Sequence, residues 1–388
     1  MEREGQKWIL DRLVRLGGMD MLFEDVKPGW MEYGFKLAEW DRTMKRVKCM
    51  DMLGPSWSKT GSQLESLGLE AERKGHYRTA MEFYYRASIC YGVAMWSRMK
   101  ENDNKREKYN IKTNECYDKV IKYCDYPIER VKIHFDNQYI SGLLHLPENK
   151  KPEGVILFCP GMDMVKEEFP NVINNVATQR GLAILSIDGP GQGDSLTRGI
   201  KVTLDNYDKA GLAAIDYLIS REDIDSNNIA IMGISMGSYW APHIAAAAGD
   251  RVRACVAMIA TYMQKESIFK LSQPSFRKNY MFMSGVYGDD EFDEMASQMT
   301  LANVAKNISC ETLLVAGEYD PLCPAEDTHE LFDMLECPKE LWLYENEFHA
   351  LGGRRAECLP MAIDWIKDAM LNKHPKNLSK KAFINEWQ

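Results

Sequence analysis

From Pro127 onward, short apolar runs alternate with amphipathic stretches, and this alternation restricts the fold more than any other feature of the chain. A hairpin pattern comes first, with alternating apolar and polar residues on both sides of Asp136-Asn137. A hairpin followed by repeated β-α units predicts an α/β fold with a mostly parallel, doubly wound sheet. Strands are expected at 155–158, 183–187, 229–232, 252–259, 312–315 and 341–344, and helices at 204–220, 236–248, 325–335 and 356–370.

Residues 1–126 have a different rhythm and are expected to form an N-terminal helical accessory domain. Apolar residues recur at helical spacing before and after Lys74-Gly75-His76, which predicts two helices joined by a tight corner. This helical pair is not repeated along the chain, so a repeat-type peptide-binding module is disfavoured. The core is expected over 127–373 with a lid at 261–307 that is rich in Met, Phe and Tyr, and 374–388 should form a polar, loosely ordered tail.

The overall composition argues against several classes of protein. The 388 residues carry a formal net charge of −9, whereas nucleic-acid binding usually needs a basic face. The polar start does not resemble a signal peptide, and no apolar stretch approaches the roughly 20 residues of a membrane-spanning helix. The ten cysteines are scattered without a CxxC pair, which disfavours metal ligation and a disulfide framework. We therefore expect a cytoplasmic protein with reduced thiols, no nucleic-acid or membrane partner, and no metal or cofactor.

The strongest motif is Gly233-Ile234-Ser235-Met236-Gly237, which lies between an expected strand and an expected helix rich in small residues. In that context, G-x-S-x-G is typical of the nucleophile elbow of α/β hydrolases, where the serine sits on a strained turn between strand and helix. The glycines allow the turn to pack closely against its neighbours. The motif predicts that Ser235 is the nucleophile of a serine hydrolase.

Two loops after the last expected strands supply candidates for the rest of a catalytic triad. In α/β hydrolases an acid follows the nucleophile in the chain, and a histidine comes last. Asp320 follows the last strand but one, with Glu318 as the alternative acid, and His349 follows the last strand. The remaining histidines lie outside the core, in the hairpin or within helices. We predict that Asp320 orients His349, which accepts the proton of Ser235.

The charge that develops on the substrate oxygen needs two backbone N–H donors. One donor is expected from Met236, the residue after the nucleophile. The other is expected from the loop after strand 155–158, where Gly161 permits a close approach and the Met162 amide is the preferred donor.

A second glycine-rich segment, Asp188-Gly189-Pro190-Gly191-Gln192-Gly193-Asp194-Ser195, resembles a nucleotide-binding loop only superficially. Asp194 stands where the third glycine of G-x-G-x-x-G belongs, and the lysine of a P-loop is missing. We interpret this segment as a turn that shapes the scaffold.

Together these features resemble one group of α/β hydrolases. The helical N-terminal part, Pro160-Gly161-Met162-Asp163 followed by Lys166-Glu167-Glu168, the Asp188 turn, the elbow and the triad are similar to those of the 2,6-dihydroxypseudooxynicotine hydrolases, the fungal polyketide-shortening hydrolases and the FrsA-like esterases. The resemblance implies an α/β-hydrolase fold and a homodimer. It also implies hydrolysis of a carbon–carbon bond next to a ketone in an aromatic or polyketide-like substrate.

The same resemblance implies a catalytic role for Glu266, which matches the position of an acidic residue that the group carries beyond the strand after the elbow. Carbon–carbon cleavage expels a carbanion or enol, which needs a proton, and a partly buried glutamic acid could donate it. The alternative is a lid glutamate in solvent, which leaves a carboxylesterase or lactonase with the same triad.

The helical part contains more aromatic side chains than the packing of a small hairpin needs, among them Trp57, Tyr84, Tyr85 and Trp96. Pockets form preferentially at domain interfaces. We therefore expect these helices and the lid to cover the active site together and to select an apolar, moderately large substrate.

Overall fold

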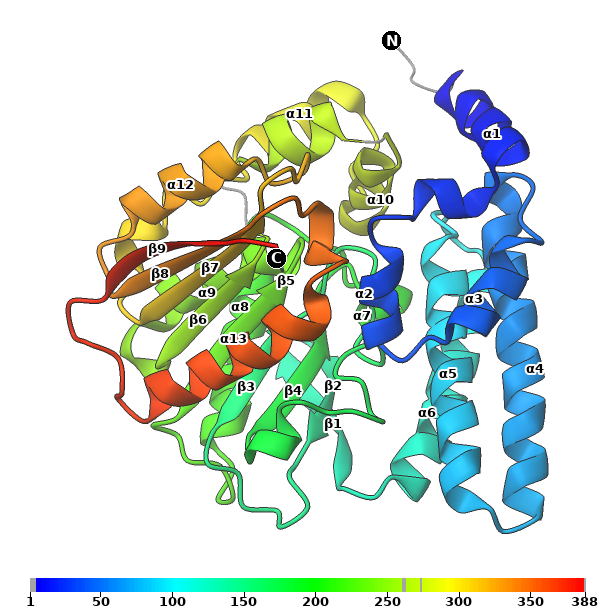
Figure 1. The fold of residues 1–388 in the computed structure, drawn as a ribbon, viewed down its shortest axis with the longest axis horizontal. Coiled ribbons are helices and arrows are strands. Elements are labelled where there is room, and N and C mark those ends of the chain that lie inside the picture. Colours follow the sequence, from blue (N-terminus) through cyan, green and yellow to red (C-terminus); the bar gives the residue numbers. More distant parts are fainter. Residues whose placement is uncertain (1–4, 260–262, 273, 387–388) are drawn as a thin grey trace.

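The computed structural model describes residues 5–259, 263–272 and 274–386 (Figure 1). Thr261 and Tyr262, which begin the expected lid, lie outside the described residues, as do 1–4 and 387–388 at the two ends of the chain. None of the helices within the described part is long and apolar enough to cross a membrane.

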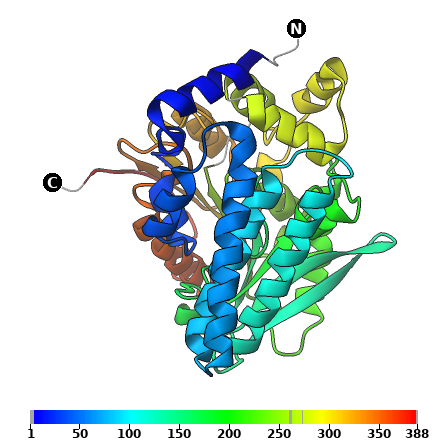
Figure 2. The ribbon, with the colours of Figure 1, turned by 90° about the vertical axis from the view of Figure 1, so that its right-hand side faces the viewer.

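Helices alone form the first part of the chain, at the right of Figure 1. The long helices α4, α5 and α6 lie side by side next to the first hairpin of the sheet (Figure 2). Gly75 joins α4 to α5 with a φ of 76°, so the corner expected there is confirmed. The elements are α1 (Gly5–Gly17), η1 (Met19–Leu22), α2 (Lys27–Glu32), α3 (Leu37–Met44), η2 (Met50–Met52), α4 (Leu53–Arg73), α5 (Tyr77–Trp96) and α6 (Asn104–Tyr123).

A nine-stranded mixed sheet forms the core, in the order β1-β2-β4-β3-β5-β6-β7-β8-β9. The hairpin β1–β2 and the pair β2–β4 are antiparallel, whereas the pairs from β4–β3 to β8–β9 are parallel. Each strand expected from the sequence is present. The strands are β1 (Ile128–Phe135), β2 (Gln138–His145), β3 (Val155–Cys159), β4 (Ala183–Asp188), β5 (Ile229–Ile234), β6 (Ala254–Met258), β7 (Glu311–Gly317), β8 (Lys339–Tyr344) and β9 (Ser379–Ile384).

Both faces of the sheet are buried, which explains why its central strands are apolar throughout. Successive side chains of a strand point to opposite faces. In β3, Ile156 and Phe158 pack with α13 and the N-terminal helices, whereas Val155 and Leu157 pack with α8 and α9. The flanking elements are η3 (Thr178–Arg180), α7 (Gly193–Thr197), α8 (Asn206–Ile219), α9 (Gly237–Ala248), η4 (Gly249–Arg251), η6 (Ala305–Asn307), α12 (Ala325–Met334), η7 (His349–Leu351) and α13 (Arg355–Met370).

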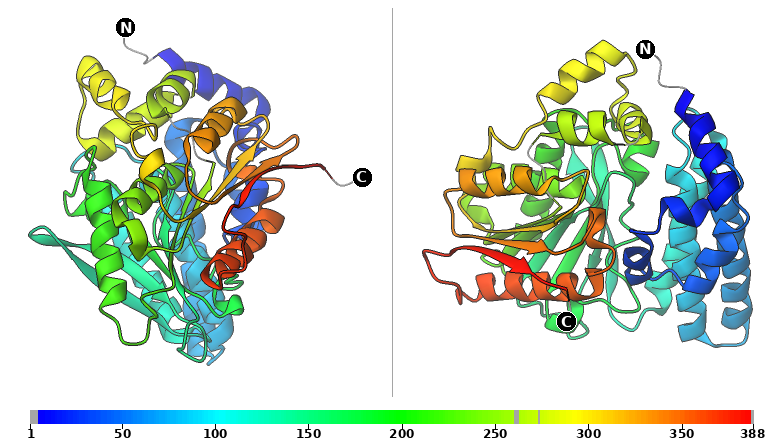
Figure 3. Two further views of the ribbon diagram at one scale, coloured as in Figure 1. Left: turned by 90° about the vertical axis from the view of Figure 1, so that its left-hand side faces the viewer. Right: turned by 45° about the horizontal axis from the view of Figure 1, so that its top comes forward.

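The expected lid is a separate helical layer formed by η5 (Lys265–Leu271), α10 (Pro274–Ser284) and α11 (Asp289–Ser297). Both views of Figure 3 place α10 on the same side of the molecule as α1. An aromatic cluster of Phe269, Tyr280 and Phe292 fixes these three elements to one another, with ring centroids 5.1 to 6.2 Å apart. The same three side chains belong to the buried cluster that lies between the sheet and helices α8 and α9, so the lid is packed onto that core.

The end of the chain differs from the loosely ordered tail that its polar composition suggests. Ser379–Ile384 form β9, which pairs in parallel with β8 at the edge of the sheet. Ala382 and Ile384 pack against the core, whereas Lys380 and Lys381 stay exposed. Charged side chains are common on edge strands because they discourage pairing with another chain, and here they conceal the strand pattern.

Candidate active site

The candidate nucleophile lies where β5 passes into α9, at the ends of the parallel strands. Ser235 has a φ of 56°, a left-handed conformation that residues with a side chain rarely adopt. A Cβ atom on Gly237 would lie 1.9 Å from the Cys159 carbonyl oxygen, and one on Gly233 would lie 2.0 Å from the Gly237 carbonyl oxygen. Both positions therefore require glycine, as the elbow motif predicts.

A hydrogen-bonded chain links Ser235 to a buried carboxylate. The Oγ of Ser235 lies 2.9 Å from Nε2 of His349, and His349 Nδ1 lies 2.9 Å from Oδ2 of Asp320. Because an ionised carboxylate only accepts hydrogen bonds, Nδ1 carries the hydrogen and Nε2 is left to accept the serine proton. Oδ1 of Asp320 also accepts the backbone N–H groups of Leu322 and Cys323 at 2.8 and 3.1 Å. The structure thus brings the three residues of the expected triad together.

Glu318, the alternative acid, lies elsewhere. Its Oε2 accepts the backbone N–H of Asn346 at 3.0 Å, which fixes the loop that follows β8. Asp320 is the carboxylate that contacts His349.

The loop after β3 packs directly against the nucleophile. A Cβ on Gly161 would lie 3.4 Å from the Cβ of Ser235, and the Gly161 carbonyl accepts a hydrogen bond from Gln192 Nε2 at 2.7 Å. The backbone N–H groups of Met162 and Met236 have no acceptor among the described residues. This is the condition that two oxyanion-hole donors should meet in the absence of substrate.

A buried cluster of ion pairs around Lys166 fixes the loop after β3. The ammonium group of Lys166 lies 2.8 Å from each of three carboxylates, those of Glu167, Asp188 and Asp194. Asn110 and Asn114 on α6 each donate to Asp194 Oδ1 at 2.9 Å. Burial raises the pKa of Glu167 to about 7, although the charge of Lys166 opposes the shift. The Asp188 turn therefore acts as scaffold, joining the loop to the helical part of the chain.

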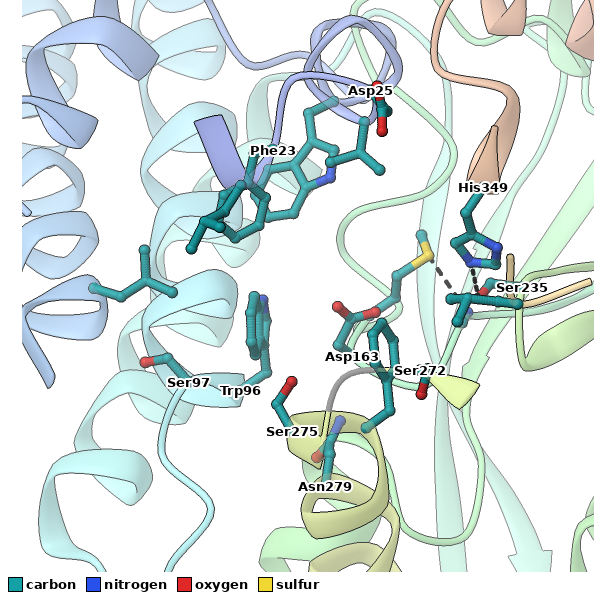
Figure 4. A pocket seen from close by; sticks show the side chains of 18 of the residues that line it. Phe23, Asp25, Trp96, Ser97, Asp163, Ser235, Ser272, Ser275, Asn279 and His349 are labelled. Carbon is teal, nitrogen blue, oxygen red and sulfur yellow. Dashed lines mark hydrogen bonds between the residues drawn. The ribbon is translucent and has the colours of Figure 1, made fainter. Parts of the chain in front are cut away.

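A pocket of about 690 Å³ lies in front of the nucleophile. Figure 4 shows Phe23 and Trp96 from the N-terminal helices on one side, Ser235 and His349 from the core on the other, and Asn279 from the lid below them. Further apolar lining residues are Leu10, Met21, Leu22, Val26, Trp30, Met50, Leu53, Met99, Met164, Ile234, Leu271, Pro274, Phe276, Pro321, Leu322 and Phe348. The N-terminal helices and the lid thus enclose the site together, as expected.

Of the aromatic residues singled out in the helical part, only Trp96 lines the pocket. Trp57 is fully buried and packs among Trp30, Phe35 and Trp40. The hydroxyls of Tyr84 and Tyr85 donate to Glu72 and to the Tyr33 carbonyl, respectively, so both rings serve packing within the helical part.

Glu266 does not lie in this pocket. Its side chain on η5 is 49% exposed, and its carboxylate accepts hydrogen bonds from Lys270 at 2.6 and 2.8 Å. Glu266 and Lys270 are four residues apart on one helical face, an arrangement typical of a surface ion pair. The structure therefore brings Glu266 neither to Ser235 nor to His349.

The pocket contains polar residues that the sequence patterns did not single out for a role. Asp163 and Glu168 belong to the loop after β3, whereas Tyr33 and Arg355 are 322 residues apart and joined by a hydrogen bond. Glu168 is 5% exposed, and its Oε1 has no hydrogen-bond partner within the described residues. Asp163 and Glu168 could have been found in the Pro160–Glu168 segment, but no local pattern predicts the meeting of Tyr33 with Arg355.

The fold and this arrangement at the ends of the strands define an α/β hydrolase, and comparisons with known proteins agree. A model of the FrsA-like esterase family matches residues 57–371. The chain belongs to the FrsA-like esterase family.

Two curated relatives and two solved structures show the range of similar proteins. The chain is 26% identical to the 2,6-dihydropseudooxynicotine hydrolase of Paenarthrobacter nicotinovorans over 328 residues, 81% of this chain and 84% of the relative. It is 23% identical to Esterase FrsA of Yersinia pestis (strain Pestoides F) over 81% of this chain and 76% of the relative. The crystal structure of the 2,6-dihydroxy-pseudo-oxynicotine hydrolase matches 93% of this chain and 99% of its own at a TM-score of 0.80 and 21% identity. AbyA5 matches 95% and 99% at a TM-score of 0.65 and 16% identity.

Proposed function

We propose that the chain is a serine hydrolase that cleaves a carbon–carbon bond next to a ketone in an aromatic or polyketide-like substrate. The observation that carries the catalytic part is the hydrogen-bonded chain from Ser235 through His349 to Asp320, which opens into a pocket lined largely by apolar side chains. The resemblance of the Pro160–Glu168 loop, the elbow and the triad to the group of carbon–carbon hydrolases supports the choice of bond.

The triad and the free amides account for the first half of such a reaction. His349 accepts the proton of Ser235 while Oγ attacks the ketone carbon, and the charge of Asp320 stabilises the resulting imidazolium. The amides of Met162 and Met236 receive the negative charge that develops on the ketone oxygen. Collapse of the adduct leaves an acyl-serine, which water attacks in a second step with His349 as the base.

A carboxylesterase or lactonase is the second candidate, and the position of Glu266 favours it. The carboxylate of Glu266 is paired with Lys270 outside the pocket, so in this arrangement it cannot protonate a leaving carbon. An alkoxide leaving group needs no such acid because the imidazolium of His349 can protonate it.

A substrate panel separates the two candidates. Wild-type protein and Ser235→Ala are assayed on 1,3-diketones with aromatic substituents and on simple aryl and alkyl esters. We expect diketone hydrolysis by the wild type and a loss of at least about 1,000-fold in Ser235→Ala for every substrate that is turned over. Ser275→Ala is the matched control, because Ser275 lines the same pocket and should change turnover by only a few-fold.

Hydrolysis of esters alone by the wild type would select the esterase. More than about a tenth of the activity remaining in Ser235→Ala would refute the assignment of the nucleophile. The expected homodimer and the cytoplasmic location stay predictions.

A further inference from the structure

A carbon–carbon hydrolase must deliver one proton to carbon, and the inference below rests on that proposed function. When Ser235 attacks, its proton moves to His349. Cleavage then leaves the bonding electron pair on carbon, which is far more basic than an alkoxide oxygen and gains from a dedicated acid held nearby. Glu266 is occupied by Lys270 outside the pocket, so another group has to supply this acid.

Acidic side chains in the pocket fall into two sets. Glu24, Asp25 and Asp51 belong to the N-terminal helical part and are exposed to solvent. Glu168 and Asp163 belong to the loop after β3, where Glu168 is buried and Asp163 is partly buried. Only this second set lies on the loop that also carries the expected oxyanion donor, so these two carboxyls are the candidates.

Asp163 is the nearer of the two to the reacting atoms along this loop. It follows Gly161 by two residues, and Gly161 packs against the Cβ of Ser235. Figure 4 shows the Asp163 carboxyl pointing into the cavity, on the side of the pocket that also holds Ser235 and His349. No hydrogen bond joins this carboxyl to another side chain within the described residues, so it is free to meet a substrate. We propose that the Asp163 carboxyl donates the proton that the leaving carbon takes up.

The surroundings of Asp163 suit a proton donor. Burial raises the pKa of Asp163, while its own backbone N–H and the charge of His349 oppose the shift. Burial raises the pKa of the neighbouring Glu168, and the charge of Asp163 raises the pKa of Glu168 further. Tyr33 and Arg355 complete the polar surroundings. Once His349 becomes an imidazolium, its positive charge favours ionised Asp163. The acid is therefore strongest at the moment when the leaving carbon needs the proton.

The proton count closes over one turnover. The carbon–carbon bond breaks, its electron pair goes to the leaving carbon, and the Asp163 proton forms the new C–H bond. The imidazolium of His349 then returns its proton to the Asp163 carboxylate, which leaves neutral histidine to take a proton from the attacking water. The neutral ketone fragment, which carries the new C–H bond, leaves after the first step. Collapse of the second adduct returns the proton to Ser235 and releases the carboxylic acid.

The test compares Asp163→Asn with Glu266→Gln, since both substitutions keep the shape of a carboxyl and remove its acidity. Each variant is assayed on the diketone that the wild type hydrolyses best and on a small activated ester. We expect Asp163→Asn to lower diketone turnover by about 100-fold or more, in line with general-acid contributions, and ester turnover by only a few-fold. Glu266→Gln should leave both activities within a few-fold of the wild type.

A pH profile and a conservative variant distinguish proton donation from a structural role. In the pH profile of wild-type diketone turnover, the rate should fall at alkaline pH as Asp163 ionises in the field of His349, Glu168, Tyr33 and Arg355. The pH profile of ester turnover should lack this alkaline limb. Asp163→Asn should remove the limb, and Asp163→Glu should restore part of the diketone activity.

Each of the remaining outcomes overturns the proposal in a distinguishable way. Diketone turnover within a few-fold of wild type in Asp163→Asn refutes it while carbon–carbon hydrolysis stands. An equal loss on ester and diketone that Asp163→Glu does not restore makes Asp163 a positioning residue of the loop. A selective loss in Glu266→Gln assigns the proton to Glu266. A wild type that hydrolyses only esters overturns the proposed function, and this inference with it.

Discussion

The backbone of Ser235 is held at a φ of 56°, and the glycines around it explain how that conformation persists. A left-handed conformation costs an ordinary residue roughly 1–2 kcal/mol. Close contacts between the elbow and the loop after β3 compensate for it, since Gly237 lies against the Cys159 carbonyl with no room for a methyl group. Ser235 and the loop after β3 are therefore packed as one unit.

We expect Gly237→Ala to destabilise the protein by about 2–3 kcal/mol, because overpacking forces the backbone apart. Hydrolytic activity should fall as well, since the shift separates Ser235 from the oxyanion donors. Gly288→Ala is the control: it has an ordinary negative φ and its nearest neighbour atoms are 3.6 Å from the added Cβ. Urea unfolding of both variants measures the difference, and an equal, small change in the two would contradict the packing argument.

The three residues of the proposed triad could be singled out because each has a signature in the local sequence. Ser235 lies in a pentapeptide with a fixed strand and helix context, and Asp320 and His349 follow identifiable strands. The polar residues of the pocket lack such signatures. Tyr33 meets Arg355 only because α2 packs against the start of α13, a contact between the two ends of the chain. The same limit applies to Glu266, whose pairing with Lys270 is decided by how the lid packs.

The interface between α6 and β2 joins the helical part of the chain to the sheet through a buried histidine. His145 on β2 is fully buried, with its Nδ1 3.1 Å from the Tyr126 hydroxyl and its Nε2 3.4 Å from the Tyr117 hydroxyl. Burial lowers the pKa of His145 to about 3. The folded interface therefore contains a neutral imidazole at every pH at which the enzyme is expected to work.

This interface should lose stability in mild acid. The unfolded chain protonates His145 below about pH 6.5, whereas the folded chain does so only near pH 3. The neutral ring thus makes its full contribution to the free energy of unfolding above pH 6.5. This contribution decreases by about 1.4 kcal/mol for each pH unit as the pH falls from 6.5 to 3. His145→Gln, which cannot be protonated, should show a flatter dependence of unfolding free energy on pH between 6.5 and 4. Identical slopes in the two proteins would show that His145 already titrates in the folded state.

Elements with strong periodicity were predictable, and those decided by pairing at an edge were not. The hairpin β1–β2, the central strands and the corner between α4 and α5 all follow from local apolar patterns. In β9, the lysines at 380 and 381 interrupt any apolar run, and the strand exists because the edge of β8 is available to it. Such a strand is a property of the sheet more than of its own six residues.

On the scale of the whole molecule, the pocket is shared by three parts of the chain. The N-terminal helices contribute Phe23, Trp30 and Trp96, the lid contributes residues of α10, and the core contributes the triad and the loop after β3. The N-terminal helices and the lid therefore contact a substrate away from the bond on which the core residues are proposed to act. Affinity and catalysis should respond to different substitutions.

Trp96→Ala tests this separation. Loss of the indole should raise KM for a bulky aromatic substrate by about tenfold, equivalent to about 1.4 kcal/mol of binding free energy. Turnover of a small ester that does not reach the helical wall should stay within a few-fold of the wild type. Trp8→Ala is the matched control, because Trp8 on α1 is 72% exposed and lies outside the pocket lining. Equal effects on both substrates would mean that Trp96 acts by supporting the fold.

The division of the pocket has a consequence for how such a chain acquires new substrates over evolutionary time. All residues that we assign to bond making and breaking follow residue 127, whereas Phe23, Trp30 and Trp96 precede it. Mutations in the first hundred or so positions can therefore alter which molecules fit while the inherited chemistry is preserved. Protein engineers can use the same division by randomising the pocket residues of the N-terminal helices in a library and screening for altered selectivity with unchanged turnover.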